Sequence, residues 1–245
     1  MPDRGHDKEE PARAGSGSAS ESRLSRRRVM TASAVFAGAG LAIAPTATAA
    51  ADTGGNAVSL GDPGTTTVEF RGRVTQSGDT GQSFTSYGYL TRASNAQQGD
   101  LFSPSTDLKD STALLTAYAT GDLQARTTDN VVHALDIVGT MTVYQRSSPG
   151  ATFDDPSSFQ AGTPVASYDM TLQDVLTVFM PGQGLPTLTG DMVQTAVQTL
   201  SGPLAGQKFG KKGARLRFFA TGLGTRTDPV LFHSQLEIAG NWSIE

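Results

Sequence analysis

His133 is a residue of this sequence whose type and surroundings could support acid–base chemistry. It lies in VVHALDIVGTMTVY, and in a strand it would share a face with Leu135, Ile137 and Met141. An imidazole in an apolar cavity is a candidate general acid or base, because it titrates near neutral pH. The nearby Asp136 is the second catalytic candidate. The alternative is a structural histidine that hydrogen-bonds a neighbour or lies at the mouth of the domain.

Three tyrosines and a methionine are candidate ligand contacts. Tyr87 and Tyr89 in SYGYL share one face of a strand, Tyr118 lies in another strand, and Met141 shares the face of His133. Tyrosines that line a cavity can stack on a ligand and hydrogen-bond it. The alternative is packing within the wall, with the hydroxyl groups in water.

The sequence carries no motif for a common cofactor or metal. It has no cysteine and 3 histidines, so a zinc site of the usual type is not expected. G-x-S-x-G, H-E-x-x-H and phosphate-loop motifs are absent. Asp154 and Asp155 in FDDPSSF could contact calcium, but a turn held by Phe153 and Phe159 explains the segment better. We therefore expect neither a cofactor nor a metal.

The N-terminal segment carries features of an export signal. Ser25–Met30 reads SRRRVM, with Arg26 and Arg27 followed by an Ala- and Gly-rich apolar run and by Pro45. Ala47 and Ala49 form a small-x-small cleavage site. The segment resembles a twin-arginine signal peptide. That resemblance implies contact with the twin-arginine export machinery and a signal peptidase, and a secreted, extracytoplasmic protein. We expect residues 1–49 to be a disordered n-region plus signal peptide, and residues 50–245 to form one domain.

Charge and hydropathy limit the partners. The chain has 19 basic and 23 acidic residues and a net charge of −4, which argues against nucleic acid and anionic membrane surfaces. The apolar run at 32–44 is shorter than the roughly 20 residues that a spanning helix needs. We expect no stable membrane insertion after cleavage.

The period of the apolar residues is two from Thr66 onward, which predicts strands. Most connections between them are rich in Gly, Pro and Asp. The sixth strand is ambiguous, since its apolar residues also fit one face of a helix; its Thr and Val residues favour a strand. The predicted strands cover residues 66–76, 83–94, 112–126, 131–146, 164–179, 187–200, 214–226 and 231–244.

Glycines recur on the apolar faces of these strands. They are Gly72, Gly121, Gly139, Gly222 and Gly240, with Gly88 a further candidate. Strong coiling of the strands in a small closed barrel is one reason for glycine there, and room for a ligand is another. The prediction is an all-β domain, a single antiparallel eight-stranded barrel, with a β-sandwich as the alternative.

In architecture alone, this pattern over residues 66–245 is similar to lipocalin, allene oxide cyclase and dirigent barrels. No catalytic motif of those families matches residue by residue. The lipocalin G-x-W near the first strand is absent, because Trp242 lies at the far end. The expected function is binding of a small, largely apolar molecule inside the barrel. The alternative is a cofactor-independent cyclase or isomerase that acts on a small substrate there. A surface protein acting through its exterior is disfavoured by the polar outer faces.

Overall fold

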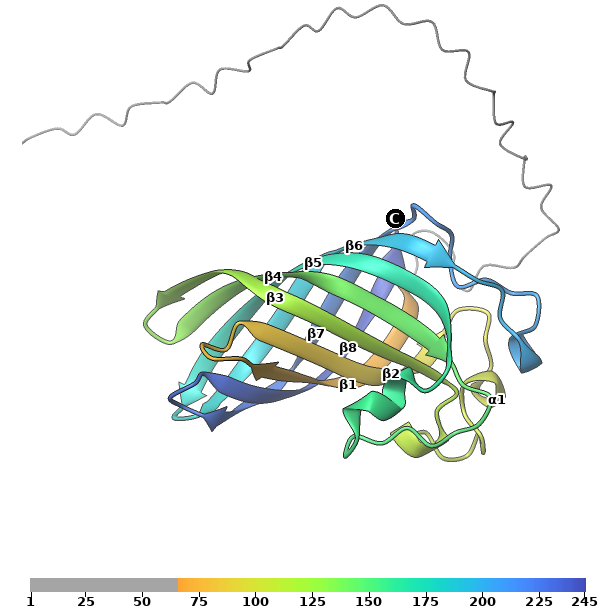
Figure 1. The fold of residues 1–245 in the computed structure, drawn as a ribbon, viewed down its shortest axis with the longest axis horizontal. Coiled ribbons are helices and arrows are strands. Elements are labelled where there is room, and N and C mark those ends of the chain that lie inside the picture. The colour runs from red at the N-terminus through yellow and green to blue at the C-terminus, as the bar shows by residue number, and fades with distance from the viewer. Residues whose placement is uncertain (1–65) are drawn as a thin grey trace, which may run out of the picture. The chain divides into compact units, whose positions relative to one another are not determined.

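The computed structural model describes residues 66–245, and these residues form a closed antiparallel barrel (Figure 1). The chain runs as a meander in which each strand pairs with the next and β1 pairs with β8. The strands are β1 (Thr66–Ser77), β2 (Ser83–Ala93), β3 (Leu115–Asp129), β4 (Val132–Gln145), β5 (Thr163–Met180), β6 (Gln183–Val197), β7 (Arg215–Asp228) and β8 (His233–Ile244).

The predicted fold class is confirmed, and the sixth element is a strand. The alternative of a sandwich is wrong because β1 and β8 pair along their length and leave no second sheet. The predicted export signal, with Arg26, Arg27, Ala47 and Ala49, lies outside the described residues. Within residues 66–245 no helix is long and apolar enough to cross a membrane.

The two ends of the barrel are built differently. Short hairpins at residues 78–82, 130–131, 181–182 and 229–232 connect the strands at one end, which we call the hairpin end; it lies at the left in Figure 1. The other end, the loop end, carries the long connections 94–114, 146–162 and 198–214. Those connections contain the short helix α1 (Gln98–Leu101) and the 3₁₀ turns η1 (Asp110–Thr112), η2 (Pro156–Gln160) and η3 (Gly202–Leu204).

Glycine pairs allow neighbouring strands to cross closely inside the barrel. Gly72 lies opposite Gly88, and Gly121 lies opposite Gly139. A Cβ atom on Gly139 would lie 2.1 Å from the carbonyl oxygen of Thr120 and 2.7 Å from Cα of Gly121. No side chain fits there, so close approach of the strands explains these glycines. They permit the strong coiling that an eight-stranded barrel requires.

The connection 146–162 covers part of the barrel's outer face. Its residues Phe153 and Phe159 pack on Tyr87, with ring centroids 6.0 and 5.5 Å apart. Thr116 Oγ1 donates a hydrogen bond to the carbonyl oxygen of Phe159 at 2.7 Å, which fixes the connection to β3. Asp155 caps η2 by accepting the Ser157 backbone N–H. The structure thus confirms the turn predicted for FDDPSSF.

Candidate functional site

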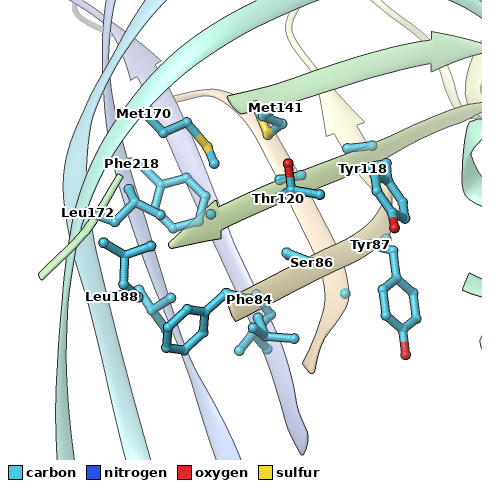
Figure 2. Close-up of a pocket in the computed structure, with 18 of the residues that line it drawn as sticks. Phe84, Ser86, Tyr87, Tyr118, Thr120, Met141, Met170, Leu172, Leu188 and Phe218 are labelled. Carbon is cyan, nitrogen blue, oxygen red and sulfur yellow. The ribbon is translucent and has the colours of Figure 1, made fainter. Parts of the chain in front are cut away.

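A cavity lies inside the barrel between the apolar faces of the strands (Figure 2). The cavity has a volume of about 70 Å³. Eight strands leave an interior just wide enough for packed side chains or one small ligand. The apolar lining side chains are Phe70, Val74, Phe84, Ile137, Met141, Met170, Leu172, Leu188, Phe218, Leu236, Ile238 and Trp242.

The cavity is sealed at the loop end by aromatic packing. Trp242 is buried and lies against Phe70, at a ring-centroid distance of 5.5 Å, and against Phe209, at 6.4 Å. Phe209 comes from the connection 198–214 and is itself fully buried. Within residues 66–245 the indole Nε1 of Trp242 has no hydrogen-bond partner. A buried unpaired donor costs about 1–3 kcal/mol, so the indole nitrogen of Trp242 reduces the stability of this end of the barrel.

Burial decreases toward the hairpin end. The inward-facing residues there, Arg126, His133, Leu176 and Arg226, are only half-buried. Beyond them the strand ends and hairpin tips expose apolar side chains. These are Val131, Val132, Phe179, Met180, Leu185, Val230, Leu231 and Phe232. The hairpin end is therefore the solvent-facing end of the interior, and its rim is largely apolar.

Asp174 is the charged residue in the cavity lining, and its side chain is buried. It is on the inner face of β5, between Leu135 on β4 and Leu188 on β6. Asp174 Oδ1 accepts the backbone N–H of Thr187 at 3.2 Å, and in residues 66–245 no basic side chain pairs with this carboxylate. Burial raises the pKa of Asp174 to about 6, against the lowering effect of that hydrogen bond. A buried carboxyl group facing an apolar cavity is typical of functional sites.

The structure separates the two catalytic candidates. His133 is on the inner face near the hairpin end, and its Nδ1 lies 3.0 Å from Thr128 Oγ1. Burial lowers the pKa of His133, and the nearby Arg226 and Arg126 lower it further. Asp136 is exposed on the outer face, where it accepts a hydrogen bond from Gln173 Nε2 at 3.1 Å. The barrel wall stands between these two side chains, so they do not form one site.

Of the four predicted ligand contacts, Met141 lines the cavity with its side chain. Tyr87 and Tyr118 border the cavity, but alternation turns their side chains to the other side of the β2–β3 wall from Phe84 and Ser86 (Figure 2). Tyr89 points outward and packs on Phe102 and Phe153. Burial raises the pKa of Tyr89. The structure thus places these tyrosines in the wall, as in the alternative given for them above, but Tyr87 and Tyr89 are buried and not in water.

Asp174, Arg126 and Arg226 were not among the predicted site residues. A signal existed for Asp174, which interrupts the apolar series Met170, Leu172 and Leu176 of β5. Arg226 likewise continues the inward series of β7. Arg126 gave no such signal, because a bulge between Leu123 and Ala125 reverses the alternation and turns Arg126 inward.

In residues 66–245 no three His, Asp or Glu side chains are grouped so that they could hold a metal ion. Comparison of the chain with protein-family models, with curated proteins and with solved structures finds no match in any of the three. The chemistry of the cavity is therefore the basis for a functional assignment.

Proposed function

We propose that this barrel binds a small, largely apolar molecule in its interior. The observation that carries the proposal is the cavity lined by side chains such as Phe84, Met141, Met170 and Phe218. An apolar cavity holds water poorly, and covering its wall with an apolar ligand gains about 25 cal/mol per Å² removed from water. The apolar rim at the hairpin end gives such a molecule a favourable route of entry.

The size of the cavity limits the ligand. With a volume of about 70 Å³, the cavity has room for more than a single water molecule but not for a large ligand. A bulky multi-ring ligand would have to displace the packed side chains at the loop end. The ligand class is therefore a small or slender molecule that lies along the barrel axis.

Asp174 favours a second candidate function, a cofactor-independent cyclase or isomerase. A carboxyl group with a pKa of about 6 can both donate and accept a proton near neutral pH. Confinement of a flexible substrate in a narrow apolar cavity also lowers the entropic part of a cyclisation barrier. Under this candidate, Asp174 is the acid–base group, and the apolar wall holds the substrate in a reactive shape.

Filling the cavity tests the binding proposal. Ala119 lies on the inner face of β3 and lines the cavity, so Ala119→Leu narrows it. Thr140 is exposed on the outer face of the neighbouring strand, and Thr140→Leu is the matched control. With 1-octanol as a slender neutral probe and isothermal titration calorimetry as the measurement, we expect Ala119→Leu to weaken binding at least tenfold and Thr140→Leu to leave it unchanged. Equal affinities in both variants, or no binding to the unmodified chain, would refute the proposal.

Native mass spectrometry of the protein from its own source separates the two candidate functions. A small molecule that co-purifies and is returned unchanged after incubation supports a binding protein. If the molecule is converted, and Asp174→Asn keeps its binding but stops its conversion, the protein is an enzyme. Conversion that continues in Asp174→Asn removes Asp174 from the catalytic role.

A further inference from the structure

Two arginines from opposite walls of the barrel meet at its hairpin end. Arg126 comes from β3 and Arg226 from β7, which are four strands apart around the closed barrel in either direction. Both face inward. Arg126 is opposite the buried Leu135, and Arg226 is opposite Ser234, which lies two residues before the inward Leu236 and so on the same face. Their side chains therefore reach toward each other across the mouth of the cavity.

The ring of Phe232 holds both guanidinium groups. Cζ of Arg126 lies 5.1 Å from the ring centroid, and Cζ of Arg226 lies 5.2 Å from it. Phe232 is in the β7–β8 hairpin with a φ of 58°, a conformation that a residue with a side chain seldom adopts. Each cation–π contact contributes about 0.5–1 kcal/mol at an exposed site. The hairpin thus fixes the two arginines beside the mouth.

This cluster of positive charge has no acidic partner within residues 66–245. Neither arginine forms an ion pair there. The nearby Asp228 uses its Oδ1 to accept the backbone N–H groups of Val230 and Leu231, and Asp174 accepts that of Thr187. Burial and the charge of Arg226 lower the pKa of Arg126, and both arginines lower the pKa of His133. The three groups are therefore close together, and the repulsion between the two guanidinium groups is not offset by an ion pair within residues 66–245.

We propose that Arg126 and Arg226, with His133, bind the anionic group of an amphiphile whose apolar part lies in the cavity. The anionic group is a carboxylate or a phosphate, because the guanidinium group presents paired N–H donors that match both. An anion there removes the repulsion between the two arginines and lies at the solvent-facing end, where its charge is not fully desolvated. This assignment rests on the proposed function and names the class of its ligand.

Three probes of equal chain length test the assignment by isothermal titration calorimetry: octanoate, octyl phosphate and 1-octanol. We expect at least one of the two anions to bind the unmodified chain at least tenfold more tightly than 1-octanol. The stronger anion identifies which group the site prefers. In R126Q/R226Q we expect the anion to bind about as tightly as 1-octanol, whose own affinity is unchanged. Arg217→Gln is the control, since Arg217 is an exposed outward residue of the same strand, β7.

Each outcome is decisive. If both anions bind no better than 1-octanol, or keep their advantage in R126Q/R226Q, the anion site is refuted while binding in the cavity stands. If none of the three probes binds, the proposed function and the anion site both fail. If the double variant does not fold, the single variants R126K and R226K replace it in the titrations. Lysine keeps the positive charge but lacks the paired N–H donors of arginine. We then expect R126K and R226K to retain part of the preference and the single variants R126Q and R226Q to retain less.

Discussion

Asp174 is a residue whose position reduces the stability of the fold. Its side chain is 3% exposed, and its strand neighbours across β4 and β6 are the apolar Leu135 and Leu188. An asparagine of the same shape could accept the Thr187 N–H without a charge. A group that a protein keeps in spite of such a penalty is more typical of function than of structure.

Asp174→Asn should therefore stabilise the protein in a pH-dependent way. The folded pKa of about 6 is above the ordinary 3.8, so the folded state retains a proton that the unfolded state loses between these values. Stability accordingly falls as pH rises through this window, by on the order of 3 kcal/mol once both states are ionised. We expect urea unfolding to show a gain of that order for Asp174→Asn at pH 7.5 and a much smaller gain at pH 4. An equal loss of stability at both pH values would contradict the buried-charge explanation.

At the scale of the strands, local alternation carries most of the information that can be read from the sequence. Val68, Phe70, Gly72 and Val74 alternate with charged residues, and they do face the interior. Side-chain direction in a strand depends only on neighbouring residues, so period two predicts it. All eight strands were predicted, and their bounds differ from the observed ones by a few residues.

Features that depend on distant segments escaped prediction. Tyr87 and Tyr89 were predicted as ligand contacts, but they face outward, and their burial comes from the connection 146–162, whose path no local pattern specifies. The inward turn of Arg126 depends on a bulge in β3. The cluster at the mouth joins residues of β3, β4 and β7, which closure of the barrel brings together. The candidate site was therefore much less predictable than the fold.

The glycine pairs give a test at this scale. Gly139→Ala would place a methyl group 2.1 Å from the Thr120 carbonyl oxygen, which is backbone and cannot rotate away. We expect a loss in the free energy of unfolding of about 3 kcal/mol or more, because β3 and β4 must separate. Gly99→Ala is the control, since nothing lies within 4 Å of a Cβ atom there. It should change stability by less than about 1 kcal/mol; a similar loss in both variants would show that the close crossing is not the cause.

At the scale of the whole barrel, the two ends have different tasks. The loop end contains the most deeply buried side chains, among them Phe102, Leu204, Phe209 and Trp242. The hairpin end carries half-buried polar groups and exposed apolar tips. Because the deeply buried contacts that stabilise the barrel lie at the loop end, the hairpin end can change conformation to admit a ligand.

Substitution of two phenylalanines at opposite ends tests whether the loop end provides stability and the hairpin end admits the ligand. Phe209 is 1% exposed and packs on Trp242, so Phe209→Ala should cost about 3–5 kcal/mol of unfolding free energy. Phe232 is 41% exposed, so Phe232→Ala should cost only about 1 kcal/mol, mainly its contacts with Arg126 and Arg226. In stopped-flow measurements of Trp242 fluorescence on mixing with 1-octanol, we expect Phe232→Ala to speed both binding and release several-fold, because the mouth is wider. Phe209→Ala should leave these rates within about twofold under conditions where it stays folded. The opposite pattern of rates would place the entrance at the loop end, because a ligand exchanges fastest through the end whose barrier has been removed.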